Sequence, residues 1–271
     1  MRTRIVSTFI LVPLAIFVWI GGIPLGIMAF IIGAMAMSEF DDGYMNIGLK
    51  PFKYTGWLCL LLLYAIYARM FTVKAPFESF TEYIMLWIFF TTCVGLVMML
   101  LNKDHSIADG PITIISVLYI GFLSSHIVLI DNLEQGSILI WLTLLTAFGT
   151  DTFAYFSGML FGKRKLCPTL SPKKTVEGSI GGVIGSILLC LVFGKIFVPE
   201  LMIHCAIIGF VGSIFAQFGD LVASAFKRRM GIKDYGNLIP GHGGILDRFD
   251  SILFTAPLIY YYIVLIVYPL H

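Results

Sequence analysis

Charged residues are scarce in this chain, and their scarcity excludes an ordinary soluble domain. Asp, Glu, Lys and Arg make up 13% of the 271 residues, whereas soluble domains carry about 25%. Hydrophobic residues reach 58%, and the mean hydropathy is +0.93. Apolar runs of about 20 residues recur, which is long enough for helices to cross a hydrocarbon core of ~30 Å. We therefore predict an all-α polytopic membrane protein.

Several common functional motifs are also missing. The five cysteines form no CxxC pair and the five histidines form no HExxH pair, so neither a zinc site nor a disulfide framework is expected. A GxxxxGK[ST] sequence is absent, which excludes a P-loop nucleotide site. We expect no nucleic-acid partner.

The apolar segments predict about nine transmembrane helices. We place them at residues 5–20, 23–38, 54–71, 83–101, 111–130, 137–160, 178–197, 201–223 and 250–269. Polar residues gather in the later segments, so we divide the chain into a transmembrane scaffold (1–135) and a transmembrane catalytic region (136–271). With nine spans, thirteen of the eighteen Lys and Arg residues fall on one side. Because excess Lys and Arg marks the cytoplasmic side, we expect a site facing the cytoplasm from the inner membrane.

Polar residues in the N-terminal half are interpreted as structural. The stretch SEFDDGYMN (38–46) holds three acids at a membrane edge and is expected to be a solvated loop. Ser124, Ser125 and His126 come late in a span, where buried hydroxyls often bond a neighbouring helix.

The C-terminal half begins with a carboxylate inside a predicted span. Asp151 at that depth costs ~2.5–3.5 kcal/mol on insertion scales, and such residues usually face a cavity or a partner. Tyr155 and Gly158 follow on the same helical face. Asp151 is therefore a candidate site residue, with a packing carboxylate paired to a nearby lysine as the alternative.

Two further polar segments follow. In SPKKTVEGSIGG (171–182), two lysines precede the start of a helix, where free N–H groups already favour anions, and glycines allow close helix packing. Asp220, Ser224 and Lys227 share a helical face, and Asp247 and Asp250 share another at the start of the last span. The simpler alternatives are a basic cytoplasmic loop and helix capping.

Together these residues indicate phosphoryl or nucleotidyl transfer. Carboxylates at Asp220, Asp247 and Asp250 are ligands of the kind that Mg²⁺ takes together with substrate phosphates. Basic residues at 173–174, 227–229, 233 and 248 can hold phosphate oxygens. Acids, a metal and bases at a membrane edge are the parts that such chemistry requires.

Three short segments follow one another near the end of the chain: Ser224-Ala-Phe-Lys-Arg, Lys233-Asp and PGHGGILDRFD (240–250). Together they resemble the signature of the phosphatidate cytidylyltransferase (CDP-diacylglycerol synthase) family. SPKKTVEGSIGG is similar to a second hallmark of that family, although Val176 stands where an aromatic residue is common. The resemblance is strong over residues 140–270. It implies a homodimer that makes CDP-diacylglycerol and pyrophosphate from CTP and phosphatidic acid with Mg²⁺.

The resemblance also implies roles for individual residues. Catalytic roles fall to Asp220, Asp247, Lys227 and Lys174, and metal ligation to Asp220, Asp247 and Asp250. Substrate binding is expected from a larger set: Ser171, Lys173, Thr175, Ser224, Arg228, Lys233, Asp234, His242, Arg248 and Asp151.

Two other functions stay open from the residues alone. A CTP-dependent polyprenol or dolichol kinase would use a similar set of acids and bases but would release CDP. A secondary anion transporter could also carry intramembrane acids and glycine-broken helices. A CDP-alcohol phosphotransferase is less favoured, because its DGxxAR motif is absent.

Overall fold

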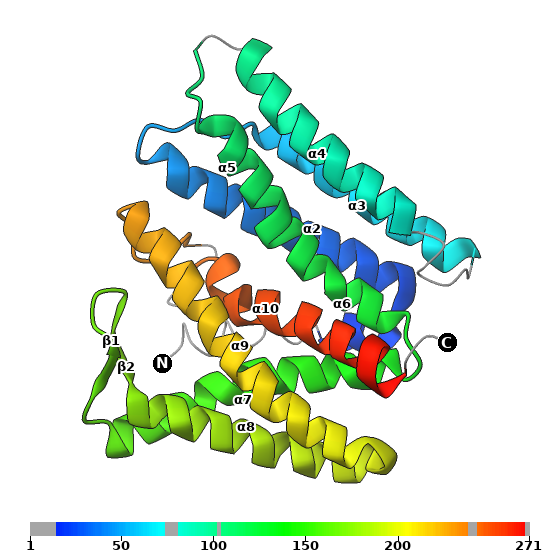
Figure 1. The fold of residues 1–271 in the computed structure, drawn as a ribbon, viewed down its shortest axis with the longest axis vertical. Helices are drawn as coiled ribbons and strands as arrows, with labels where there is room; N and C mark the ends of the chain where they lie inside the picture. The colour runs from blue at the N-terminus through cyan, green and yellow to red at the C-terminus, as the bar shows by residue number, and fades with distance from the viewer. Residues whose placement is uncertain (1–14, 74–80, 102–103, 238–242, 269–271) are drawn as a thin grey trace. The chain divides into compact units, whose positions relative to one another are not determined.

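The computed structural model describes residues 15–73, 81–101, 104–237 and 243–268, which are mostly helical (Figure 1). Within this described part, seven helical segments are long and apolar enough to cross a membrane. The chain is therefore an all-α polytopic membrane protein, while the predicted count of nine spans is not confirmed. The predicted first span at 5–20 lies largely outside the described residues, of which 15–20 are helical.

The helices follow the predicted spans closely, with extensions at several ends. In chain order the elements are α2 (Gly22–Met45), α3 (Lys53–Val73), α4 (Thr81–Leu101), α5 (Asp109–Ser116), the π-helix η2 (Val117–Phe122), α6 (Leu123–Asp131), α7 (Gly136–Phe161), β1 (Lys165–Cys167), β2 (Ser171–Thr175), α8 (Val176–Phe197), the 3₁₀ turn η3 (Pro199–Leu201), α9 (Met202–Arg229), α10 (Leu246–Tyr262) and the π-helix η4 (Ile263–Val267).

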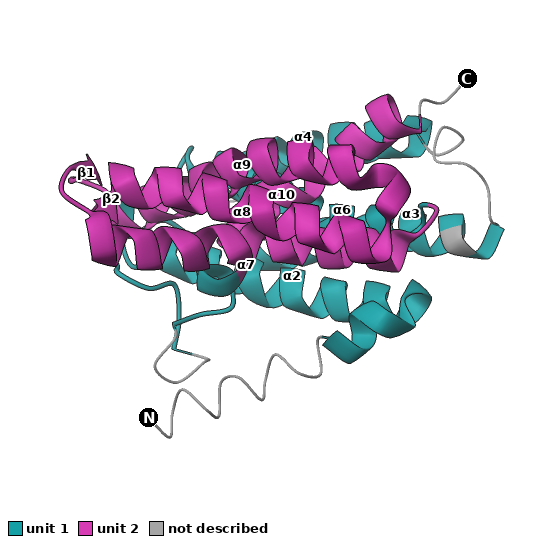
Figure 2. Ribbon diagram, turned by 90° about the horizontal axis from the view of Figure 1, so that it is seen from below, with its two compact units in different colours: residues 1–133, 229–248 teal, residues 134–228, 249–271 magenta. Residues whose placement is uncertain are grey.

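The chain divides into two compact units, coloured separately in Figure 2. Unit 1 comprises residues 1–133 and 229–248, and unit 2 comprises residues 134–228 and 249–271. The predicted division into a scaffold (1–135) and a catalytic region (136–271) concerns function and stays a prediction. Each unit is described by itself below.

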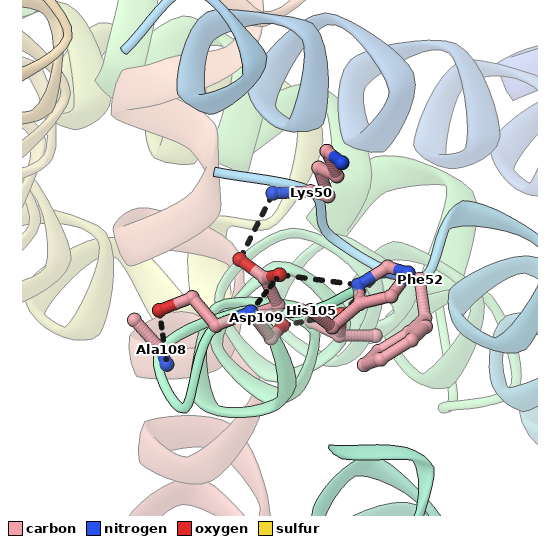
Figure 3. Close-up of polar contacts among 7 residues, drawn as sticks. Lys50, Phe52, His105, Ala108 and Asp109 are labelled. Carbon is pink, nitrogen blue, oxygen red and sulfur yellow. Dashed lines mark hydrogen bonds and ion pairs between the residues drawn. The ribbon is translucent and has the colours of Figure 1, made fainter. Parts of the chain in front are cut away.

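A buried carboxylate of unit 1 lies at the start of α5. Asp109 is 1% exposed. It accepts hydrogen bonds from the backbone amides of Lys50 (2.9 Å) and Ser106 (2.8 Å), and it lies 3.1 Å from His105 Nδ1 (Figure 3). The His105 ring stacks on Phe52 at 4.2 Å between centroids. Because these bonds join the segment before α3 to the start of α5, Asp109 is explained as a structural residue.

The C-terminal end of α2 corrects the prediction that residues 38–46 form a solvated loop. Residues 38–45 continue the α2 helix instead of forming a solvated loop, and Asp41 is 1% exposed. The three acids have different surroundings, because Asp42 pairs with Lys53 at 2.5 Å and Glu39 accepts two backbone hydrogen bonds from residues 245–246. The helix thus runs about two turns past its predicted apolar segment.

Unit 2 is built on close contacts at glycines. Several glycines of α8 face α7. A Cβ atom added at Gly178 would lie 2.8 Å from Ala154 O. One added at Gly182 would lie 3.0 Å from Thr150 O, and one at Gly185 would lie 2.1 Å from Phe153 Cγ. Figure 1 shows α7 and α8 side by side, with the β1–β2 hairpin at one end. The predicted role of these glycines in close helix packing is confirmed.

The other helices of unit 2 approach in the same way. A Cβ atom at Gly209 of α9 would meet the α8 backbone at 2.9 Å, and one at Gly219 would lie 2.6 Å from the carbonyl oxygen of Asp250 on α10. Small residues at such contacts let helix backbones pack closely where lipid offers no hydrophobic driving force. The close approach brings the polar positions of α7, α8, α9 and α10 within reach of one another.

The segment between α7 and α8 is an antiparallel hairpin, with Lys165 opposite Thr175 and Cys167 opposite Ser171. Glu177 ties the start of the hairpin to α8 by accepting hydrogen bonds from the amides of Lys163 (3.0 Å) and Arg164 (3.2 Å). Thr175 caps α8 by accepting a hydrogen bond from Gly178 N at 3.1 Å, the usual task of an N-cap threonine. The basic segment therefore has a fixed path into α8.

Candidate active site

A hollow of about 340 Å³ with several charged residues in its lining lies in unit 2 where α7, β2, α8 and α9 meet. Its charged lining comes from different elements: Asp151 from α7, Lys173 and Lys174 from β2, and Asp220 from α9. Apolar residues of α7 complete one wall, and two of these, Tyr155 (67% exposed) and Met159 (61% exposed), also form part of the outer surface. The hollow therefore presents charge beside a surface suited to acyl chains.

The predicted face of α7 is confirmed by this hollow. Asp151, Tyr155 and Gly158 all line it, as their helical spacing indicated. Asp151 accepts a hydrogen bond from Ser251 Oγ of α10 at 3.1 Å.

An ion pair crosses the hollow. Lys174 Nζ contacts Asp220 Oδ2, and both side chains are about one quarter exposed. Ser224 Oγ, one turn further along α9, donates a weak hydrogen bond of 3.4 Å to Asp220 Oδ1. The lysine before α8 and the acid on α9 therefore line one hollow, while the catalytic roles predicted for them stay a prediction.

Two more charged groups near Asp220 are buried. Asp250 is 7% exposed and Lys227 is 9% exposed. The Asp250 carboxyl interacts electrostatically with Asp220, Lys227 and Asp151, and its Oδ1 accepts a hydrogen bond from Ser251 N at 2.8 Å. Three carboxyl groups thus surround a region that holds two lysines, and burial there is costly for any charge that lacks a partner.

The oxygen-rich composition of this cluster fits a magnesium ion that is bound together with a phosphate. Among the described residues, no group of three acid, histidine or cysteine side chains is close enough to hold a metal by itself. Mg²⁺ does not require such a cage, because it usually keeps several waters and takes one or two carboxylates plus substrate phosphates. Asp220 and Asp250 are two carboxylates of this cluster that could serve in this way.

Asp247 lies in the first turn of α10 and is described within unit 1. Its Oδ2 accepts hydrogen bonds from Tyr235 N (2.8 Å) and Gly244 N (2.9 Å). The local geometry depends on Gly243, whose φ of +84° is a left-handed conformation that glycine adopts without strain. The expected joint metal site of Asp220, Asp247 and Asp250 stays a prediction.

The remaining candidates are distributed over both units. In unit 2, Lys173 is exposed, Ser171 is partly buried at the start of β2, and Arg228 donates from Nε to Leu170 O at 3.3 Å. In unit 1, Lys233 and Asp234 are exposed, while Arg248 is partly buried on α10. His242 lies outside the described residues.

Ser179 and Gln217 are polar residues of the hollow that were not identified as site residues from the sequence. Ser179 Oγ donates to Gln217 Oε1 at 2.5 Å, and Gln217 Nε2 donates to Ser213 O at 3.3 Å. Both side chains line the hollow. Helical spacing could have indicated them, because Ser179 lies one turn after Thr175 and Gln217 one turn before Asp220.

Comparison with known proteins identifies the family of the chain. The chain belongs to the cytidylyltransferase family, whose sequence model matches residues 2–266. Phosphatidate cytidylyltransferase of Bacillus subtilis (strain 168) is 33% identical over 272 residues, which cover 98% of each chain. A protein of the same name from Staphylococcus epidermidis (strain RP62A) is 34% identical over 267 residues and 95% of each chain. The relative of that name from Staphylococcus saprophyticus is 44% identical over 162 residues, which cover 59% of this chain and 61% of that protein.

Proposed function

We propose that the protein transfers the cytidylyl group of CTP to phosphatidic acid, giving CDP-diacylglycerol and pyrophosphate. One observation carries the proposal: lysines and aspartates from separate elements line a single hollow, and exposed apolar side chains of α7 line it as well. One substrate carries acyl chains and the other is a soluble triphosphate, so the site needs both kinds of surface. The names of the relatives from Bacillus and Staphylococcus support the same substrates.

In the proposed reaction, an oxygen of the phosphatidate phosphate attacks the α-phosphorus of CTP. A new P–O bond forms as the bond to the α,β-bridging oxygen breaks, and pyrophosphate leaves with that electron pair. A phosphomonoester is already largely dianionic near pH 7, with a second pKa of about 6, so no strong general base is required. Alignment of the two anions and neutralisation of their charge account for most of the catalysis.

The residues of the hollow have roles that follow from their charge. Lys173 and Lys174 bind triphosphate oxygens through charge-assisted hydrogen bonds, and Thr175 caps the helix start beside them. When the triphosphate enters, Lys174 exchanges Asp220 for a phosphate oxygen. Lys227, buried next to Asp250, offsets the charge of the acids.

Mg²⁺ is proposed as the cofactor, and when bound it supplies neutralisation of the phosphate charge. Asp220 and Asp250 would hold it, with Asp247 as the third predicted ligand. The predicted roles in substrate binding are kept for the remaining candidates: Ser171, Ser224, Arg228, Lys233, Asp234, Arg248, His242 and Asp151. We further propose a homodimer in the cytoplasmic membrane with the site facing the cytoplasm.

The test is an incubation of purified protein in detergent with phosphatidic acid, Mg²⁺ and CTP labelled at the α-phosphorus. We expect the label to enter the lipid extract and pyrophosphate to appear in equal amount. Release of CDP with an unlabelled lipid would instead indicate a kinase that transfers the γ-phosphoryl group. A protein that forms no product in detergent but moves an anion across sealed vesicles would be a transporter.

A further inference from the structure

Glu39 of α2 holds the start of α10, although more than 200 residues separate them in sequence. Its Oε1 accepts a hydrogen bond from Ile245 N, and its Oε2 accepts one from Leu246 N, both at 2.9 Å. All three residues belong to unit 1. A carboxylate at this end of a helix also interacts favourably with the helix dipole.

The surroundings of Glu39 are shaped to receive a carboxylate. A Cβ atom added at Gly236 would lie 2.8 Å from Oε1, and one added at Gly244 would lie 2.3 Å from Oε2. The absence of side chains at these two positions therefore lets the backbone close around the carboxylate. Ile245 and Leu246 are buried, at 8% and 0% exposure, so their amides have little access to water as an alternative partner.

The same short segment also holds Asp247. Gly244 N donates to Asp247 Oδ2 at 2.9 Å, and the next two amides along the chain donate to Glu39. Three consecutive amides are thus shared between two carboxylates, and the position of one carboxylate constrains the other. Loss of Glu39 would leave two buried amides without an acceptor, which makes the segment that orients Asp247 rearrange.

We propose that Glu39 is a positioning residue that orients Asp247 for the reaction. Its catalytic consequence rests on the proposed function, in which Asp247 is a metal ligand. Glu39 acts at a distance through the backbone of residues 244–246 and does not itself bind substrate. The required geometry is specific, because both carboxylate oxygens are used.

Three variants of the full-length protein separate positioning from simple stabilisation. Glu39→Ala removes both acceptors. Glu39→Gln keeps one acceptor oxygen and turns an N–H donor towards the other amide. Asp42→Asn is the matched control, because it removes one negative charge from the same helix at a half-exposed side chain that pairs with Lys53.

The first measurement is hydrogen–deuterium exchange of peptides covering residues 243–248 without substrate. We expect faster exchange in Glu39→Ala, an intermediate rate in Glu39→Gln and the wild-type rate in Asp42→Asn. Unchanged exchange in Glu39→Ala would overturn the inference, because the bonds would then not hold the segment.

The second measurement is the kinetics of the folded fraction. We expect Glu39→Ala to lower kcat about 10-fold or more, to raise the Mg²⁺ concentration for half-maximal activity several-fold, and to leave KM for CTP within about 2-fold. Glu39→Gln should recover part of the loss. Normal kcat and Mg²⁺ dependence in folded Glu39→Ala would overturn the positioning role of Glu39 and leave the proposed function intact. Absence of product from the wild-type protein would overturn the proposed function, and with it the catalytic role of Glu39.

Discussion

Lys174 on β2 and Asp220 on α9 form an ion pair across the hollow of unit 2. The hairpin fixes the lysine and the close contact between α9 and its neighbours fixes the acid, so the pair joins two segments that are 46 residues apart. Each partner is partly exposed, and a pair of this kind contributes little to stability. The arrangement is better explained by substrate binding, because a phosphate could replace Asp220 as the partner of Lys174 and a cation could replace Lys174 as the partner of Asp220.

Replacement of the acid tests this explanation first. Asp220→Asn keeps the shape of the side chain but removes its charge, so we expect turnover to fall at least about 10²-fold, as for the loss of other electrostatic catalytic groups. Turnover is measured by lipid-extractable label, and folding by size-exclusion chromatography and thermal unfolding. A folded variant with most of the wild-type turnover would show that Asp220 is not a metal ligand.

Replacement of the lysine should affect substrate binding. Lys174→Met removes a charge that we assign to the triphosphate, so we expect KM for CTP to rise about 10-fold or more. Lys195→Met is the matched control, because Lys195 is an exposed residue in the last turn of α8 and does not line the hollow. Equal effects of the two substitutions would contradict a specific role for Lys174.

Removal of divalent cations should abolish the reaction. Since the carboxyl cluster fits Mg²⁺ only in company with phosphate oxygens, a chelator such as EDTA is expected to remove the cation readily and stop product formation. Added Mg²⁺ in excess of the chelator should restore it. Full activity in EDTA would refute the metal role.

The glycine contacts predict where added volume destabilises the protein. Gly182→Val would force a side chain against α7, where a Cβ atom alone would already lie 3.0 Å from Thr150 O and 3.0 Å from Ala154 Cβ. Overpacking of this kind costs about 1–3 kcal/mol. Gly26→Val in α2 is the control, because a Cβ atom there meets nothing within 4 Å. We expect a lower midpoint of thermal unfolding for Gly182→Val alone, and similar midpoints would contradict the packing account.

Much of the fold could be predicted from hydropathy alone. The spans predicted at 83–101, 137–160 and 178–197 match α4, α7 and α8 within two residues at each end, because apolar composition is what the membrane selects. The extension of α2 through Glu39 could not be predicted in this way. Glu39 accepts hydrogen bonds from amides more than 200 residues along the chain, and hydropathy carries no information about such partners.

The charged residues that line the hollow could be singled out from the sequence, but their pairing could not. Helical spacing correctly placed Asp151 with Tyr155, and Asp220 with Ser224, because one helix fixes its own faces. The ion pair of Lys174 with Asp220 depends on how the β1–β2 hairpin packs beside α9, which local sequence does not specify. Ser179 and Gln217 were not identified for a related reason, since neutral polar residues in a span usually serve helix packing.

The central claim is that the carboxylates of unit 2 bind a divalent cation together with CTP. A crystal grown with Mn²⁺ in place of Mg²⁺ and with a non-hydrolysable CTP analogue tests it directly, because the anomalous signal of Mn²⁺ locates the ion. We predict a peak at the carboxylates of Asp220 and Asp250, next to the α-phosphate, with the ammonium group of Lys174 moved to a phosphate oxygen. A triphosphate bound elsewhere, or Lys174 still paired with Asp220 and no ion beside it, would contradict the account.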